Sequence, residues 1–315
     1  MACPALVGAA GPGTSAATFL QLGYGARPFG LGEAFVAVAD DVAALHYNPA
    51  GLALPASPAL AGDGRYELLL SQAMEIQGVS LSQMGLIRRP FGFSVTSLNV
   101  GGIERRDSET DQSEGSYGAS DLALAASYAR LVGDVGLGVT GRFIRSEIGG
   151  TSAMALAVDA GALTRLERWP VSLGASVANL GSKMRYIDES YPLPLTVRLG
   201  AAAGMTKRFP HAVSLELDLN RDSGPVFRLG AEYLGFGPFA MRAGFQTAGR
   251  EQKDAVLGRA LGSSASGLTG LYGFFMGLGV RTRYGNLDYA LVPYGELGQA
   301  HRISLSLTFG KGGAR

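Results

Sequence analysis

From about residue 63 to residue 309, apolar side chains alternate with polar or small ones over long segments. His211–Asn220, for example, carries an apolar residue at every second position: Val213, Leu215, Leu217 and Leu219. Because successive side chains of a strand point to opposite faces, this pattern predicts strands with one apolar and one polar face. Strands of soluble proteins are typically about 5–6 residues long, whereas strands that cross a bilayer need about 9–11. The length of the alternating segments therefore predicts strands that span a membrane.

About fourteen such strands are expected, and an even number is the rule for bacterial outer-membrane barrels. The fold class predicted is all-β, a transmembrane antiparallel barrel. The expected strands cover 64–74, 77–88, 91–104, 117–131, 134–147, 152–166, 170–180, 194–207, 211–221, 225–234, 237–247, 269–283, 286–293 and 300–309.

The connections between these strands give an independent test of the barrel. Every second connection is a short turn, near Pro90, Gly133, Pro238 and Gly285. Several of the others are long: Glu104–Ser116, Gly181–Tyr191 and Thr247–Gly270. Short periplasmic turns that alternate with longer external loops are typical of outer-membrane barrels. The long loops are a candidate surface for a protein partner, and simple solvated loops are the alternative.

Composition excludes several other classes of protein. Hydrophobic residues make up 47% of the chain and charged residues 17%, against about 25% charge in soluble proteins. No run of about 20 apolar residues is present, so no membrane-spanning helix is expected. The 27 basic and 26 acidic residues are interspersed, which gives no electrostatic basis for nucleic-acid binding.

Nothing in the sequence indicates catalysis, a metal site or a cofactor. The chain has one cysteine, and its three histidines fall in separate segments without the spacing of metal ligands. No GxSxG motif accompanies the available Ser, His and Asp residues, so a nucleophile elbow is not expected. The sequence therefore predicts a protein that is not an enzyme.

The first sixty residues differ from the rest of the chain. Residues 1–10 resemble the end of a secretory signal whose positive region is missing, 11–62 are expected to form a hatch or plug, and 63–310 the barrel. Gly23–Gly32 is too rich in glycine for a regular element. The hatch is too short for a core of its own, so the barrel lumen is expected to bury it.

Five residues are candidates for fixing the hatch in place: Asp40, Asp41, Asn48, Pro49 and Gly51. Asp40 and Asp41 have the position of a helix N-cap for a turn or two through His46, and Asn48–Gly51 is a turn sequence. Capping and turn formation is one interpretation of these residues. The other is that they bind basic residues of the lumen.

Strand phase predicts which charged side chains face that lumen: Arg142, Arg198, Glu216, Arg228, Arg242 and Arg281. A mixed-charge lumen favours ion pairs with a packed plug. Arginine also suits the bidentate recognition of a carboxylate, so a ligand role stays open. Small residues on the same face, such as Gly136, Gly138 and Ala155, indicate room for something packed closely inside.

Residues Gly25–Ala53, GARPFGLGEAFVAVADDVAALHYNPAGLA, resemble the N-terminus of the PorV/PorQ family of outer-membrane proteins. Later stretches are similar as well: Val177–Glu189, Pro192–Ala202, Phe239–Thr247 and Leu287–Gly310. That family is related to the FadL-type long-chain fatty-acid transporters. The resemblance implies a fourteen-stranded barrel in the bacterial outer membrane, surrounded by its lipid, with an N-terminal hatch in the lumen.

The same resemblance implies two kinds of function. Members of PorV type are secretion or surface-assembly partners of a type IX system, which work through contacts with secreted or other envelope proteins. FadL-like relatives are channels for hydrophobic small molecules such as long-chain fatty acids. The first is the function expected here, and the second is the alternative.

Overall fold

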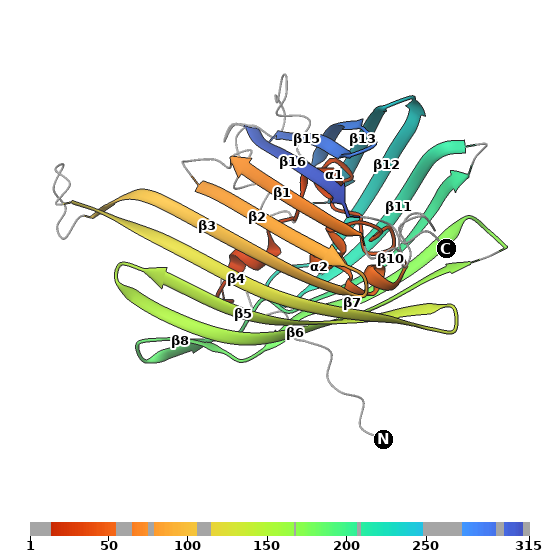
Figure 1. Ribbon diagram of the computed structural model, residues 1–315. Coiled ribbons are helices and arrows are strands. Elements are labelled where there is room, and N and C mark those ends of the chain that lie inside the picture. The colour runs from red at the N-terminus through yellow and green to blue at the C-terminus, as the bar shows by residue number, and fades with distance from the viewer. Residues whose placement is uncertain are drawn as a thin grey trace.

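The computed structural model describes residues 14–54, 65–74, 79–105, 115–166, 168–206, 209–247, 273–293 and 299–310. The expected signal remnant (1–10) and most of the loops Glu104–Ser116 and Thr247–Gly270 lie outside these residues. The described chain forms a tall closed barrel around its own N-terminal part (Figure 1).

Fourteen strands of the described chain form the barrel, and each is hydrogen-bonded to its neighbours in an antiparallel ladder. They are β1 (Tyr66–Met74), β2 (Val79–Arg88), β3 (Phe91–Arg105), β4 (Gly115–Val132), β5 (Val135–Ile148), β6 (Thr151–Leu166), β7 (Val171–Gly181), β10 (Thr196–Thr206), β11 (Phe209–Asn220), β12 (Val226–Phe236), β13 (Phe239–Gln246), β14 (Phe274–Arg281), β15 (Gly285–Pro293) and β16 (Gln299–Phe309). Pairing of β1 with β16, from Tyr66 opposite Phe309 to Met74 opposite His301, closes the barrel. The predicted fold class is confirmed.

The two ends of the barrel differ in their connections. The turns after β2, β4, β12 and β14 cover only residues 89–90, 133–134, 237–238 and 282–284. We call this the turn end, and the opposite end, which carries the longer connections, the loop end. Short turns face the periplasm in outer-membrane barrels, so the turn end is the periplasmic one.

Large apolar side chains cover the outside of the barrel. Each barrel strand carries at least one large apolar side chain that is exposed. Taking one such residue from each strand in chain order gives Leu70, Met84, Phe93, Leu124, Leu137, Leu156, Leu173, Leu199, Leu215, Leu229, Met241, Leu278, Leu287 and Ile303. A soluble protein does not expose an apolar belt of this extent. The belt is the lipid-facing surface of a barrel in the bacterial outer membrane.

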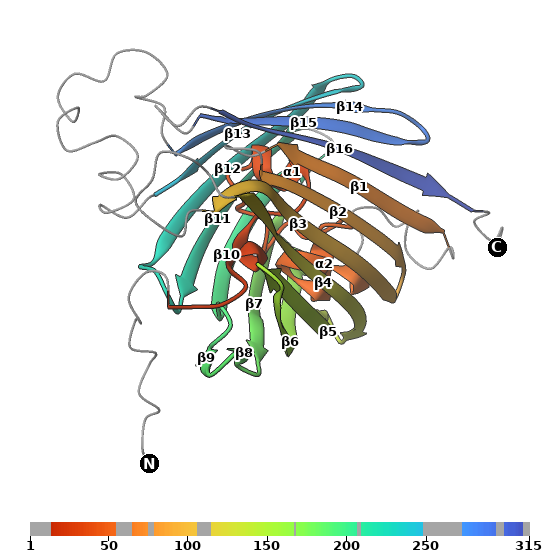
Figure 2. The same cartoon turned by 90° about the vertical axis from the view of Figure 1, so that its left-hand side faces the viewer.

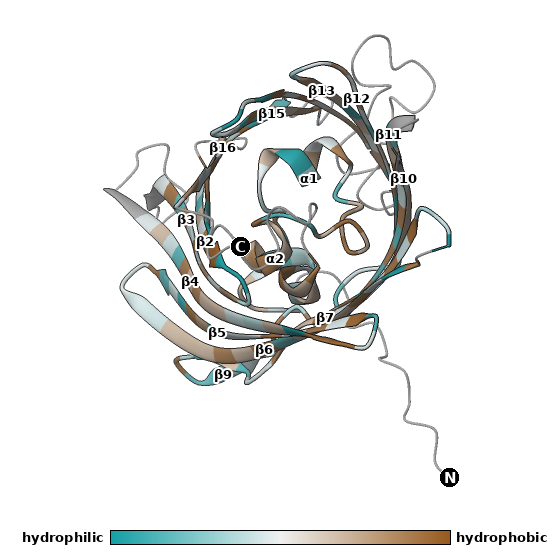
Figure 3. Cartoon of the chain, turned by 45° about the vertical axis from the view of Figure 1, so that its right-hand side comes forward, coloured by the Kyte–Doolittle hydropathy of each residue, from teal (hydrophilic) through white to brown (hydrophobic). Residues whose placement is uncertain are grey.

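Residues 14–54, which we call the inner segment, lie inside the ring of strands (Figure 3). Their elements are single turns: η1 (Thr18–Gln21), α1 (Ala26–Gly30), α2 (Ala44–Tyr47) and η2 (Pro49–Ala53). None of the described helices is long and apolar enough to cross a bilayer. The apolar side chains of the inner segment pack against wall residues such as Leu69, Ile87 and Leu163. Because the wall buries these side chains, the inner segment needs no core of its own.

Three local expectations from the sequence differ from the structure. The connection after β7 contains a small hairpin, β8 (Met184–Tyr186) and β9 (Glu189–Tyr191), at the loop end (Figure 2). Gly23–Gly32 does contain a regular turn, α1, whose Ala26 N–H is accepted by Ser304 Oγ of the wall at 3.1 Å. Helix α2 begins after Ala43 without a side-chain cap, because Asp41 accepts the Ala43 N–H instead, before the helix.

Candidate functional site

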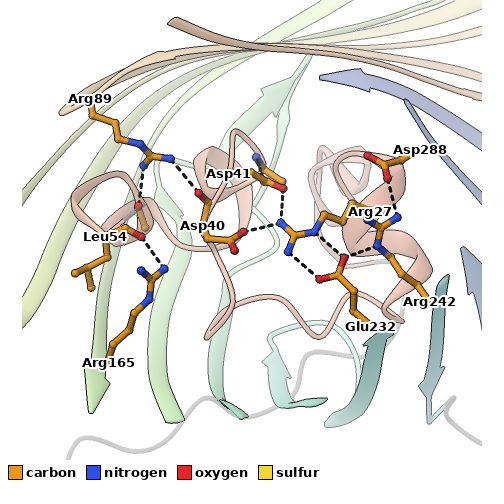
Figure 4. A network of polar contacts seen from close by, with 11 residues as sticks. Arg27, Asp40, Asp41, Leu54, Arg89, Arg165, Glu232, Arg242 and Asp288 are labelled. Atoms are coloured by element: carbon orange, nitrogen blue, oxygen red, sulfur yellow. Dashed lines mark hydrogen bonds and ion pairs between the residues drawn. The ribbon is translucent and has the colours of Figure 1, made fainter. Parts of the chain in front are cut away.

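Arg27 of α1 is the centre of an ion-pair network inside the lumen. Its Nη1 donates to Asp40 Oδ1 at 2.6 Å and to Asp41 Oδ2 at 2.7 Å. Its Nε and Nη2 donate to the two carboxylate oxygens of Glu232, on β12, at 3.1 and 3.0 Å. Figure 4 shows the three carboxylates gathered around this one guanidinium. Arg27 thus folds the inner segment back on itself and binds it to the wall.

The network continues along the wall through Arg242 of β13. Its Nε donates to Glu232 Oε1 at 2.7 Å, and its Nη1 donates to Asp288 Oδ1 of β15 at 2.7 Å. All three of these side chains are at most 3% exposed. Glu232 therefore lies between two arginines, one from the inner segment and one from the wall. Removing one partner of such a buried pair leaves an uncompensated charge, which is strongly destabilising.

Burial and neighbouring charges act in opposite directions on this network. Burial works against the charge of Arg27, but Asp40, Glu232 and Asp41 outweigh it, so the pKa of the guanidinium lies well above its ordinary value. For Asp41, burial raises the pKa of the carboxyl despite the attraction of Arg27. Asp41 also has the more exposed side chain, 32% against 13% for Asp40. Asp40 is therefore the firmer of the two contacts.

A second group of charges holds the middle of the inner segment. Glu33 pairs with Arg228 of β12, whose Nε also donates to Asp218 Oδ2 of β11 at 2.8 Å. Glu216 Oε2 of β11 accepts the backbone N–H groups of Phe35 and Val36, both at 2.7 Å. Charge-assisted hydrogen bonds of this kind are among the strong ones in proteins. The wall thus supplies an acceptor to backbone donors that no strand or helix satisfies.

Asn48 fixes the turn that follows α2. Its Oδ1 accepts the Ala50 N–H at 3.2 Å, which caps η2, and Pro49 occupies the first position of that turn. Its Nδ2 donates to Val36 O at 2.9 Å and to Ala162 O of β6 at 3.0 Å. Asn48 therefore caps a local turn and binds the wall at the same time.

The wall beside this turn is built from residues without large side chains. A Cβ added to Gly138 would overlap backbone atoms of Pro49 and Ala50, and one added to Gly161 would overlap the Asn48 side chain. Gly51 is required for a different close approach, since a Cβ there would overlap the Ala39 carbonyl. The glycines of the wall thus let the inner segment lie against the backbone of the barrel.

Arginines outside the predicted set bind carbonyl oxygens of the inner segment. Arg89 donates to Gly51 O at 2.9 Å and Asp40 O at 3.0 Å, Arg165 donates to Leu54 O at 2.8 Å, and Arg302 donates to Gly23 O. Arg89 and Arg165 are drawn in Figure 4. Strand phase places Arg302 on the polar face of its strand, so the alternation pattern does indicate that its side chain faces the lumen. Arg89 lies in a turn, where phase says nothing.

The predicted arginines do not all reach the inner segment. Arg142 of β5 pairs with Asp159 of the neighbouring strand β6 at 2.5 Å. Arg281 donates to Leu234 O and Gly237 O beside the β12–β13 turn. The ion pairs of Asp40 and Asp41 also differ from the expectation. Both carboxylates bind Arg27, within their own segment, and not the arginines of the wall. Asp40 and Asp41 are connected to the wall only indirectly, because Arg27 binds both of them and also binds Glu232 of β12.

His46 of α2 lies between aromatic rings in the same lumen. Its ring stacks on Tyr24, with centroids 5.8 Å apart, and meets Tyr47 edge-on at 4.9 Å. Burial, and then the positive charges of Arg198 and Arg142, hold the pKa of His46 well below its usual range. His46 is therefore neutral, and a proton on it would face arginines from several strands.

Two cavities adjoin the inner segment and share no lining residue. The turn-end chamber has a volume of about 810 Å³, and Arg27, Asp40, Asp41 and the rim residue Trp169 line it. The loop-end chamber measures about 270 Å³, and Gln21, Phe29 and Glu33 contribute to its lining. The inner segment thus has a chamber on either side. The described residues contain no group of acidic, histidine or cysteine side chains that could hold a metal ion.

No protein-family model matches the chain, and no curated protein matches it either. Solved structures do. The Pseudomonas putida toluene transporter TodX aligns with a TM-score of 0.55 and 12% identity, over 91% of this chain and 96% of its own. The monoaromatic hydrocarbon channel CymD gives 0.55 and 11%, over 93% and 98% of the two chains. A Pseudomonas aeruginosa FadL homologue gives 0.50 and 12%, over 90% and 98%. At these identities the likeness establishes the fold alone, an outer-membrane barrel of the kind that these three proteins have.

Proposed function

We propose that this protein is an outer-membrane channel for small hydrophobic molecules, in which the inner segment is a hatch that controls passage. The observation that carries the proposal is the presence of a chamber on either side of the segment, one of about 810 Å³ and one of about 270 Å³. The shared fold with a toluene transporter and a hydrocarbon channel supports it. In this proposal residues 11–62 are the hatch domain and 63–310 the barrel domain.

Helix α1 is the part of the hatch best placed to open. Arg27 lines the turn-end chamber, and Phe29, two residues further on, lines the loop-end chamber. Displacing this one turn therefore joins the two chambers without moving the rest of the segment. Of the five predicted hatch residues, Asn48, Pro49 and Gly51 then hold the frame of the hatch in place while α1 moves. Asp40 and Asp41 hold α1 closed through Arg27.

A reversible lock tests this proposal. Ala26 of α1 and Ala290 of β15 are both at most 1% exposed and belong to one buried cluster, so paired cysteines there are expected to tie α1 to the wall. The change is made in a Cys3→Ser background and expressed in cells that lack a channel of this fold. We expect oxidised cells to lose uptake of labelled toluene or long-chain fatty acid, and reductant to restore it.

Either single cysteine is the matched control, because it cannot form the bond. If uptake by the locked protein equals that of the reduced one, the hatch role is wrong. If neither exceeds cells without the protein, the channel function itself is wrong.

The second candidate function is a secretion or surface-assembly partner of PorV type. The observation that favours it is the PorV/PorQ-like sequence of Gly25–Ala53 together with the later similar stretches. It predicts that mild crosslinking of intact cells joins the barrel to a secreted or envelope protein, and that deleting residues 251–268 of the connection after β13 reduces this product. Recovery of the uncrosslinked barrel alone would count against it.

A further inference from the structure

The loop-end chamber contains charged groups whose hydrogen bonding is incomplete. It lies beside β10, β11 and β12, which are neighbours in the barrel wall (Figure 1). Arg198 of β10 and Asp218 of β11 are register partners across the ladder, and both side chains line the chamber. Residues directly opposite in a ladder have their Cβ atoms about 4.5–5.5 Å apart. The two residues therefore lie next to each other in the lining of the chamber.

Each of these side chains has one atom without a partner among the described residues. Arg198 Nη1 is a buried donor without an acceptor, and Asp218 Oδ1 is a buried acceptor without a donor. Asp218 uses its other oxygen for Arg228, and the nearest carboxylate oxygen to Arg198 is that of Glu216, 3.9 Å from its Nε. Arg198 is 6% exposed and Asp218 2%. Buried polar groups almost always have partners, so something in the chamber is expected to complete this pair.

The charges around the chamber limit what can enter it. Three arginines are present, Arg198, Arg228 and Arg302, and three carboxylates, those of Glu33, Asp218 and the adjoining Glu216. A carboxylate ligand at Arg198 would lie against Asp218 and Glu216, while an ammonium ligand would lie against the arginines. A bare hydrocarbon would leave both unpartnered atoms as they are. An uncharged group that both accepts and donates a hydrogen bond meets neither objection.

The rest of the lining fits the apolar part of such a molecule. Leu22, Phe29, Val226 and Phe275 contribute to the chamber, and the rings of Phe29 and Phe275 meet edge-on with centroids 5.3 Å apart. Pockets for small molecules commonly combine apolar walls with a few placed polar groups.

We propose that the loop-end chamber binds an uncharged, hydroxyl-bearing molecule, an alcohol or a phenol, whose oxygen accepts from Arg198 Nη1 and donates to Asp218 Oδ1. This inference rests on the proposed channel function for its meaning in transport. It refines that function, because it makes the preferred substrate a hydroxylated compound and neither a plain hydrocarbon nor a carboxylate.

Four probes with one phenyl ring test the proposal: toluene, benzyl alcohol, benzoate and benzylamine. Their dissociation constants are measured by calorimetry on the purified full chain in detergent. A hydrogen bond to a charged group is worth enough to strengthen binding about tenfold or more. We expect benzyl alcohol to bind at least about tenfold more tightly than each of the other three.

Variants locate the binding and assign the roles. Val226→Trp, which fills the chamber without changing a charge, is expected to abolish the preference for benzyl alcohol. Arg198→Gln should reduce benzyl alcohol to the level of toluene, and Asp218→Asn should shift the preference toward benzoate. Arg145→Gln is the matched control, since Arg145 lies on the outer face of the barrel with its side chain 47% exposed.

Equal affinity for toluene and benzyl alcohol would overturn the proposal, because the chamber would then hold only water at these atoms. A preference that survives Val226→Trp would overturn it too, since the site would lie elsewhere. These two tests need only the unchanged protein and Val226→Trp, so they remain decisive even where Arg198→Gln or Asp218→Asn fails to fold. The toluene-uptake assay separates the channel function from the alcohol site. Uptake of toluene by a protein that shows no preference for benzyl alcohol would support the channel function and exclude only the alcohol site.

Discussion

Replacing Arg27 by methionine should release α1 from the wall. The change keeps most of the apolar stem but removes the guanidinium that binds Asp40, Asp41 and Glu232. Truncating one partner of a buried ion pair typically costs about 3–5 kcal/mol. The lower end applies here, because Glu232 keeps Arg242 and the Asp41 side chain is 32% exposed. We therefore expect a loss of about 3 kcal/mol, which corresponds to roughly a hundredfold more of the open form.

The reporter is a single cysteine at Ala26, which is 1% exposed, in the Cys3→Ser background. Its maleimide labelling rate in the folded barrel follows the fraction of time that α1 is open, provided closing is fast relative to labelling. The matched control is Arg145→Met. Arg145 pairs with Glu147 at 3.1 Å, but both side chains are nearly half exposed, so this pair contributes at most about 1 kcal/mol.

Heat-modifiable gel mobility confirms that each variant still forms the barrel. Adding Asp41→Asn to Arg27→Met should recover part of the protection, since it removes one of the carboxylates left unpaired. A labelling rate for Arg27→Met within threefold of that for Arg145→Met in intact barrels would contradict this prediction, because α1 would then be held by packing alone.

Three further predictions concern His46, Gly138 and Asn48. Burial lowers the pKa of His46 in the folded protein below its value in the unfolded chain, so acidification from pH 7.5 to 5 should lower the stability by up to about 2 kcal/mol, measured by thermal unfolding. His46→Phe should remove this loss, and Asp41, whose pKa is raised, acts with the opposite sign in both proteins. Gly138→Ala should raise labelling or lower thermal stability by about 1–3 kcal/mol through overlap with the turn after α2, whereas Gly141→Ala on the same strand, where a Cβ meets nothing within 4 Å, should change neither. Asn48→Ala removes three hydrogen bonds of a fully buried side chain and should cost about 2–4 kcal/mol by thermal unfolding; a change below 1 kcal/mol would mean that water replaces the amide.

The barrel was predictable from the sequence because its signal is local. Alternation within a strand reports the face of each side chain, so the outward position of Leu215 and the inward position of Glu216 follow from the residues beside them. The hairpin β8–β9 was not predictable in this way. Its strands have three residues each, which is too few for a period of two to be recognised.

The contacts inside the lumen were predictable only in part. Strand phase places Arg242 and Glu232 on the inner face, but it does not say which partner each one meets. Arg27 and Glu232 are 205 positions apart and belong to different parts of the fold, so no local pattern connects them. The sequence does not single out Arg27 for a related reason: a lone arginine within a glycine-rich stretch has no periodicity from which the direction of its side chain can be inferred.

The burial of the inner segment argues against any mechanism in which it leaves the barrel as a whole. Nine of its large apolar side chains are at most 4% exposed: Phe19, Leu20, Phe29, Leu31, Phe35, Val36, Val42, Leu45 and Leu52. Burying each contributes about 1.5–3 kcal/mol, so exposing all of them would cost more than about 10 kcal/mol, comparable to the total stability of a typical domain. Displacing α1 exposes only one of these nine side chains, Phe29, and breaks the ion pairs of one residue, Arg27. A local opening between the two chambers is therefore the movement that thermal energy and a bound substrate can drive, and it is the movement that the lock between Ala26 and Ala290 prevents.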